Sequence, residues 1–200
     1  MPNMSSSPDA IADYYDRRAD EYDATSWEYT GGDSRVVKLV QEALGSLSYV
    51  DTLDVGCGTG YVSRWLPGRL TLIDASAAML SIAKRRLVSA ACVRGRAPLL
   101  PFTDSSFARI FTGNLYGHLA LPVRLQLVEE MFRVAEEFVV LDQLSSSDEY
   151  SEGPELRQLM DGSAYAIHKC YFTLERLLQE LGGGDILMAG PVFAIIRRRR

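Results

Sequence analysis

The sequence predicts an α/β fold with a doubly wound, mostly parallel sheet of seven strands. The chain has 200 residues, of which 47% are hydrophobic and 24% charged, the length and composition of one globular domain. Short apolar runs alternate with stretches of helical periodicity, and no repeat or long linker interrupts them. We therefore expect a single domain over residues 1–200.

Seven segments have the pattern of strands. Five are short apolar or β-branched runs that end in turn residues, at 49–55, 69–73, 90–94, 108–112 and 137–142. Two further runs, 185–189 and 192–196, are separated by Gly190 and Pro191, which predicts a C-terminal antiparallel hairpin. Helices are expected at 34–46, 60–66, 76–88, 123–135 and 173–181, with Ser76 and Thr173 as N-caps.

Two segments lie outside this alternation. Within residues 1–30, six side chains recur at steps of three and one, which predicts one face of a helix: Ile11, Tyr14, Tyr15, Arg18, Ala19 and Tyr22. An arginine in this face is costly to bury unless an anion meets it. Residues 145–170 are polar and irregular in pattern, and we expect them to form an insertion on the substrate side of the sheet.

Charge and composition exclude several classes of function. The net charge of −5 argues against nucleic acid as a partner, because phosphate recognition needs clustered Lys and Arg. The basic run 197–200 is interpreted as a solvated tail after the last strand. No apolar run is long enough for a membrane span and the N-terminus lacks a signal peptide, so a cytoplasmic protein is expected.

The three cysteines lack the spacing of a zinc site or a disulfide framework, and no metal is expected. We expect the partner to be a small molecule, bound by a monomer or a homodimer.

A glycine-rich loop is the sharpest motif in the sequence. Gly56, Gly58 and Gly60 follow the first expected strand and open a helix, where they permit a sharp turn and the close approach of a ligand. Asp74 follows the second strand, where a carboxylate can accept hydrogen bonds from ribose hydroxyls. This order predicts a nucleoside site. Because Tyr61 stands where the dinucleotide fingerprint has its third glycine, a NAD-type oxidoreductase is the less favoured alternative.

With these motifs the sequence resembles the class I S-adenosylmethionine-dependent methyltransferases, from about residue 14 to the terminal hairpin. The resemblance implies a Rossmann-like fold, S-adenosyl-L-methionine as cofactor and S-adenosyl-L-homocysteine as product. It implies that Asp74 holds the ribose and that Ala75 and Met79 flank the adenine. The residues it assigns to the amino-acid end of the cofactor are Asp54, Gly56, Cys57, Gly58 and Gly60.

Two later segments extend the resemblance. Gly95, Arg96 and Ala97 match the family's segment on the adenine side of the cofactor, where an acid usually stands in place of Arg96. The resemblance still implies a hydrogen bond from the backbone N–H of Ala97 to a ring nitrogen of the adenine. Asn114 and His118 fall in the loop after the fourth strand, which in the family borders both cofactor and acceptor. This loop does not spell Asn/Asp-Pro-Pro-Tyr, so a nucleic-acid base loses support as the acceptor.

The stretch 14–23 is similar to the N-terminal helix that folds over the site as a lid in small-molecule members of the family. The resemblance implies that Arg18 pairs with the carboxylate of the cofactor. It also implies that Tyr15 and Tyr22 close over the methyl group and exclude water. A non-catalytic S-adenosylmethionine-binding protein is the alternative to an enzyme.

We expect the acceptor to be a small acid that is methylated at oxygen. Arg157, Tyr165 and Lys169 supply two cations and a phenol, and their stretch looks like the corresponding part of small-molecule O-methyltransferases. The alternative is that both cations only pair with nearby acids. Tyr116 and His118 complete the expected acceptor site, and His118 is the candidate general base because the chain has only two histidines.

Overall fold

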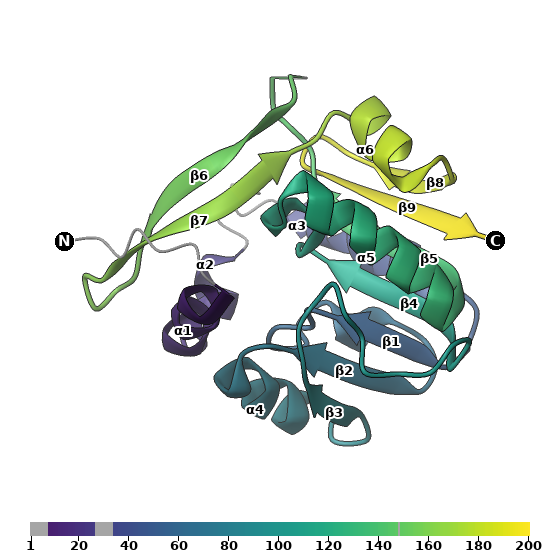
Figure 1. Ribbon diagram of the computed structural model, residues 1–200, viewed down its shortest axis with the longest axis horizontal. Helices are drawn as coiled ribbons and strands as arrows, with labels where there is room; N and C mark the ends of the chain where they lie inside the picture. Colours follow the sequence, from purple (N-terminus) through teal and green to yellow (C-terminus); the bar gives the residue numbers. More distant parts are fainter. Residues whose placement is uncertain (1–7, 27–33, 148) are drawn as a thin grey trace.

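The computed structural model describes residues 8–26, 34–147 and 149–200. Its centre is a seven-stranded sheet with the strand order β3-β2-β1-β4-β5-β9-β8 (Figure 1). The first five strands in the chain pair in parallel, and β9 joins β5 and β8 in antiparallel fashion. This arrangement confirms the predicted sheet and its C-terminal hairpin. The strands are β1 (Thr52–Val55), β2 (Leu70–Asp74), β3 (Ala91–Arg94), β4 (Phe107–Gly113), β5 (Ala135–Gln143), β8 (Asp185–Ala189) and β9 (Phe193–Arg199).

Helices cover both faces of the sheet because successive strand residues point to opposite sides. On β4, Ile110 belongs to the core beneath α5 (Leu121–Val134) and α6 (Leu174–Leu181). The next residue, Phe111, packs into the core of α3 (Ser34–Gly45) on the other face. α4 (Ala77–Arg86) covers β2 and the edge strand β3. The predicted N-caps are confirmed: Ser76 accepts from the Met79 N–H and Thr173 from the Arg176 N–H.

The helix expected at 60–66 is wrong. That stretch contains one 3-10 turn, η2 (Ser63–Trp65), which ends where Leu66 becomes extended at φ −77° and ψ 127°. Pro67 explains the early end, because the ring of a proline disfavours helical backbone in the residue before it.

The N-terminal residues form two short helices, so the expectation of one helical face through Tyr22 is also wrong. α1 (Pro8–Arg18) ends four residues before Tyr22, and Tyr22 is the first residue of a separate helix, α2 (Tyr22–Thr25). The break lets the two helices contact different parts of the sheet domain: Asp16 on α1 reaches Ser76 at the start of α4, and Asp23 on α2 reaches Thr59 in the glycine loop.

Residues 145–170 were expected to be irregular, and most of them form a β-hairpin instead. β6 (Ser151–Gln158) and β7 (Ala164–Tyr171) pair as a separate antiparallel sheet that arches above α1 and α2 (Figure 1). On β7 the buried residues Tyr165, Ile167 and Lys169 alternate with less buried ones. A charged residue among the buried ones conceals this strand pattern in the sequence. Tyr165 and Ile167 pack against Tyr14 of α1.

The expectation of a solvated tail at 197–200 is wrong, because β9 continues through Arg199. Arg197 pairs with Asp185 of β8 at 2.7 Å, and Arg199 pairs with Glu137 of β5 at 2.7 Å. Neighbouring carboxylates therefore hold these arginines on the sheet. Among the described residues, no helix is both long enough and apolar enough to pass through a membrane.

Candidate functional site

The glycine loop follows β1 and depends on its glycines. Gly56, Gly58 and Gly60 have positive φ angles of 72°, 53° and 71°, which glycine adopts at little cost. A Cβ on Gly56 would lie 2.8 Å from the Cδ2 atom of Leu115, so the loop after β4 packs directly on the glycine loop. The glycines therefore serve both the turn and the close approach of the two loops.

A small cavity that is open to solvent lies over this loop. Its walls include Tyr22 of α2, Asp54 of β1, Gly58 and Asn114. Asn114 has φ 58°, a left-handed conformation that asparagine tolerates better than most residues. The cavity therefore lies at the carboxyl ends of β1 and β4, where open α/β sheets bind their ligands.

Asp74, at the end of β2, connects the glycine loop to α4. Its Oδ2 atom accepts a hydrogen bond from the Gly58 N–H at 2.8 Å, and its Oδ1 atom accepts one from the Ser76 N–H at 2.9 Å. Burial raises the pKa of Asp74, and the two N–H bonds oppose that rise. The carboxylate thus stands beside the loop, as predicted.

Asp54 is fully buried in the cavity wall. Its Oδ2 atom accepts from the Ser63 hydroxyl, and its Oδ1 atom has no hydrogen-bond partner among the residues that the structure describes. Burial raises the pKa of Asp54 to about 7. A buried acceptor without a donor is costly, so a ligand that brings an ammonium or another donor to this wall would be stabilised.

The other expected cofactor residues lie at the same edge of the sheet. Met79 is buried in α4, Ala75 precedes that helix, and Gly95 follows β3 and packs on Ile73. Arg96 is exposed and pairs with Asp9 of α1 at 3.4 Å. Ala97 lies next to it and precedes a cis bond to Pro98. Burial raises the pKa of the Cys57 thiol well above its usual range.

Three lid residues predicted from the sequence lie together on the N-terminal helices. The guanidinium carbon of Arg18 is 4.8 Å from the ring centre of Tyr22, and Arg18 donates to the Tyr14 hydroxyl at 3.0 Å and to Thr25 Oγ1 at 3.1 Å. The ring of Tyr15 is 6.3 Å from that of Tyr22. The predicted pairing of Arg18 with a cofactor carboxylate stays a prediction.

Sequence reasoning missed the two carboxylates that attach these helices to the sheet domain. Asp16 accepts from the Ser76 hydroxyl at 2.5 Å and from the Ala78 N–H at 3.0 Å. Asp23 accepts from the Thr59 hydroxyl at 2.5 Å and forms an ion pair with Arg86 of α4. The N-cap role of Ser76 was a usable signal, but nothing local indicated that an acid of another helix would meet it.

His118 ends a short 3-10 turn, η3 (Tyr116–His118), after β4. Its Nδ1 atom lies 2.9 Å from the carbonyl oxygen of His168 on β7. Because a carbonyl oxygen only accepts, Nδ1 carries the proton of the neutral ring and Nε2 is the acceptor. Burial, and then the positive charge of Lys169, hold the pKa of His118 well below its ordinary range. The ring of Tyr15 lies edge-on at 6.4 Å.

The hairpin residues expected at the acceptor site share one face of β6 and β7. Arg157 stands opposite Tyr165 in the register, and Arg157 and Lys169 both act on the charge state of His118. Lys169 is buried, with its Nζ atom 3.7 Å from Asp142 Oδ1. Arg157 pairs with Glu155, as expected if this cation only pairs with a nearby acid.

Two expected acceptor residues are already engaged within the protein. The Tyr165 hydroxyl donates to Asp13 of α1 at 2.8 Å. Tyr116 is fully buried in the main core, where its ring lies 5.8 Å from that of Phe172. Its ring therefore packs beneath the turn that it belongs to, and the expected direct contact of Tyr116 with an acceptor is not supported.

The comparisons with known proteins agree with this geometry. A family model described as a methyltransferase domain matches residues 52–137, which include the glycine loop, Asp74 and His118. The chain is 34% identical over 109 residues to a demethylmenaquinone methyltransferase of Renibacterium salmoninarum, covering 52% of this chain and 46% of that protein. It is 31% identical over 109 residues to a malonyl-[acyl-carrier protein] O-methyltransferase of Yersinia pestis, covering 53% of this chain and 39% of that protein.

The chain therefore matches about half the length, or less, of these curated relatives. Among solved structures, the DhpI-SAM-HEP complex has a TM-score of 0.77 at 24% identity, and the match covers 97% of this chain and 100% of that chain. The likeness shows that the whole fold is shared. The methyltransferase domain over residues 52–137, the relatives named as methyltransferases and the shared fold all agree with the resemblance to the class I S-adenosylmethionine-dependent methyltransferases that the sequence predicts.

Proposed function

We propose that this protein transfers a methyl group from S-adenosylmethionine to an oxygen atom of a small acidic acceptor. The observation that carries the proposal is the setting of His118: a partly buried, neutral imidazole between Tyr15 of α1 and the β6–β7 hairpin, with Nδ1 held by a carbonyl and Nε2 left as an acceptor. In this proposal α1 and α2 act as a lid and the hairpin covers the acceptor side.

The residues around the glycine loop fit the cofactor. The Oδ1 atom of Asp54 offers a buried acceptor to the ammonium of its amino-acid end, and Asp74 offers carboxylate oxygens to the ribose hydroxyls. Gly58 presents backbone without a side chain, and Met79 offers an apolar surface for the adenine. When bound, S-adenosylmethionine supplies an electrophilic methyl group on a sulfonium centre.

His118 is proposed as the general base. An acceptor hydroxyl must lose its proton as the new carbon–oxygen bond forms, and Nε2 can take that proton if the ring is neutral. Its lowered pKa keeps the ring neutral at physiological pH. Tyr15 and Tyr22 cover the site and limit the entry of water, which leaves positioning as the main contribution of the protein.

The acidic nature of the acceptor is proposed from the cations near His118. Besides burial, the positive charges of Lys169 on β7, Arg157 on β6 and Arg18 on α1 each lower the pKa of His118. A carboxylate or phosphonate placed there would gain charge-assisted hydrogen bonds. The malonyl-[acyl-carrier protein] O-methyltransferase relative, by its name, methylates oxygen, which supports an oxygen acceptor here.

Calorimetry and a product screen test the proposal. We expect S-adenosylhomocysteine to bind and NADH not to bind. We also expect extracts of small molecules, incubated with the protein and isotopically labelled cofactor, to yield a methylated acid detectable by mass spectrometry. His118→Asn should lower kcat by about 10²- to 10⁴-fold and leave the affinity for S-adenosylhomocysteine unchanged. Cofactor binding without any methylated product would favour the non-catalytic alternative, and binding of NADH alone would favour an oxidoreductase.

A further inference from the structure

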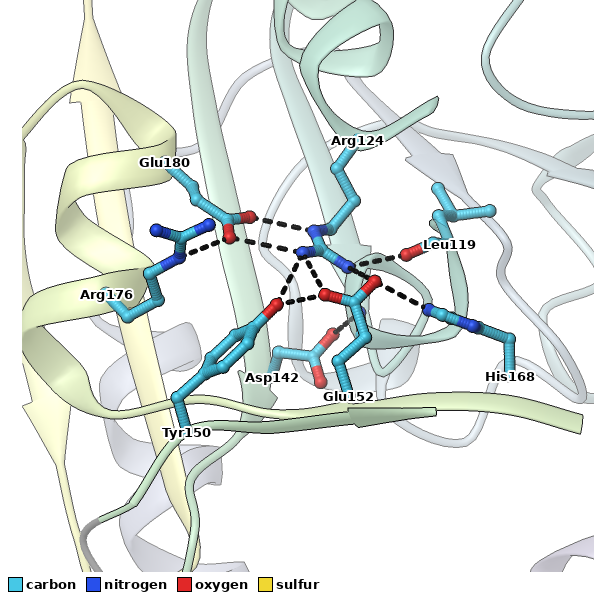
Figure 2. A network of polar contacts seen from close by, with 9 residues as sticks. Leu119, Arg124, Asp142, Tyr150, Glu152, His168, Arg176 and Glu180 are labelled. Atoms are coloured by element: carbon cyan, nitrogen blue, oxygen red, sulfur yellow. Dashed lines mark hydrogen bonds and ion pairs between the residues drawn. The ribbon is translucent and has the colours of Figure 1, made fainter. Parts of the chain in front are cut away.

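We propose that Arg124 is a positioning residue for His118, and that it acts through Glu152 and His168 on one side and through Leu119 on the other. The inference deepens the proposed function, because it rests on His118 as the base. It concerns a buried polar network between α5, α6 and the β6–β7 hairpin, drawn in Figure 2.

Arg124 of α5 is fully buried and its guanidinium is hydrogen-bonded along both edges. One edge contacts Glu180 of α6, with Nε at 2.8 Å from Oε2. The other edge faces the hairpin: the two terminal nitrogens lie 3.2 Å and 3.1 Å from the carboxylate oxygens of Glu152. Figure 2 shows Arg124 at the centre of this network, with the carboxylates of Glu180 and Glu152 both turned toward its guanidinium. A bidentate arginine–carboxylate contact of this kind fixes the orientation of both side chains and also pairs their charges.

From Glu152 the contacts continue to the candidate base. The Glu152 Oε1 atom lies 2.9 Å from Nε2 of His168, and the carbonyl oxygen of His168 accepts from Nδ1 of His118. Burial tends to raise the pKa of Glu152, but hydrogen bonds from Arg124 and Tyr150 outweigh it and lower this pKa to about 2. Glu152 is therefore ionised at any working pH and holds its place between Arg124 and His168.

A second set of contacts holds the turn that carries His118. Arg124 donates to the carbonyl oxygen of Leu119, the residue after His118, at 2.7 Å. The residue before it, Gly117, donates its N–H to Asp142 Oδ2 at 2.8 Å. A Cβ on Gly117 would lie 2.8 Å from Asp142 Oδ1 and 2.8 Å from the carbonyl oxygen of Cys170, so the turn packs closely on β5 and β7 at this residue. Both neighbours of His118 and its Nδ1 atom are thus fixed to β5, α5 and β7.

The arrangement exceeds what packing of α5 on α6 requires. Arg176 already pairs with Glu180 at 2.8 Å within α6, and a buried arginine is expensive unless its contacts are complete. The contacts of Arg124 with Leu119 and Glu152 lead toward the site. These contacts hold the imidazole of His118 in one orientation with its proton on Nδ1, which leaves Nε2 unprotonated.

The chain has only two histidines, so ¹⁵N NMR of histidine-labelled protein observes His118 directly, and the loss of its signals in His118→Asn assigns them. The parent protein should show His118 as the neutral form with the proton on Nδ1. We expect a mixture of the two neutral tautomers of His118 in two variants. One is Arg124→Lys, which keeps the positive charge but cannot make the bidentate contact, and the other is Glu152→Gln. The charged groups that face the ring, Lys169, Arg157 and Arg18, stay in place in both variants.

Arg176→Lys is the matched control, because Arg176 pairs with Glu180, and Glu180, Arg124 and Leu119 stand between it and His118 in the network. It should leave the His118 tautomer as in the parent. The proposal is overturned if His118 keeps its proton on Nδ1 in folded Arg124→Lys and Glu152→Gln, even if both melt at lower temperature. Should Arg124→Lys fail to fold, Glu152→Gln alone decides.

The same variants separate this inference from the proposed function. If the tautomer responds to the network but His118→Asn retains full activity, the positioning holds and the role of His118 as base fails. If the network variants lower kcat at least tenfold and leave the Kd for S-adenosylhomocysteine within twofold, both stand.

Discussion

Asp74→Ala tests the cofactor site most directly. The substitution removes the acceptor of the Gly58 and Ser76 N–H groups and the carboxylate proposed to hold the ribose. A hydrogen bond to a charged group contributes about 1.5 to 3 kcal/mol, so the loss of two to the ribose weakens binding by at least about 3 kcal/mol. Since about 1.4 kcal/mol corresponds to tenfold, the Kd for S-adenosylhomocysteine should rise more than about 100-fold.

Isothermal titration calorimetry measures this effect, with circular dichroism to confirm that the variant is folded. Asp51→Ala is the control, because this carboxylate pairs with Arg69 at 2.6 Å on the surface and lies just before β1, away from the carboxyl ends of the strands. Its Kd should equal that of the parent. If folded Asp74→Ala binds within about threefold of the parent, the role of Asp74 in holding the ribose is refuted.

Three further predictions concern the lid, the acceptor site and the hairpin. Residues 11–22 should exchange amide hydrogens more slowly when S-adenosylhomocysteine is added, as measured by mass spectrometry; equal exchange would argue against a lid. Once an acceptor is known, Arg157→Ala and Lys169→Ala should each lower kcat/KM at saturating cofactor, and changes within about threefold, under 1 kcal/mol, in both would contradict the anion site. Glu152 has a pKa of about 2 in place of 4.5, so its stabilisation is complete above pH 4.5 and is lost as the pH falls toward 2. Urea titrations should show a loss of stability across that window that is smaller than the roughly 3 kcal/mol of the full pKa shift, because solvent screens this partly exposed carboxylate, and Glu152→Gln should flatten this part of the curve; an unchanged slope would contradict the assignment.

Local pattern was sufficient for much of the fold. The inner parallel strands β1, β4 and β5 bury both faces and are therefore largely apolar runs, and the glycine loop with Asp74 has a fixed order along the chain. These features depend on residues close in sequence, so the sheet, its terminal hairpin and the N-cap Ser76 were predicted. The same holds for the loop that places Gly58 near Asp74.

Only the tertiary structure decided the features made by distant partners. The β6–β7 hairpin was missed because its buried face includes Lys169, whose charge is met by Asp142 of β5. The arginines of β9 were misjudged because Glu137, 62 positions before Arg199, pairs with them. The setting of His118 likewise depends on a carbonyl 50 positions away and on an arginine whose two glutamates lie 28 and 56 positions along the chain. A charge in the sequence has no visible partner until the chain folds, because the free energy of burying it depends on groups that only the fold brings within hydrogen-bond distance.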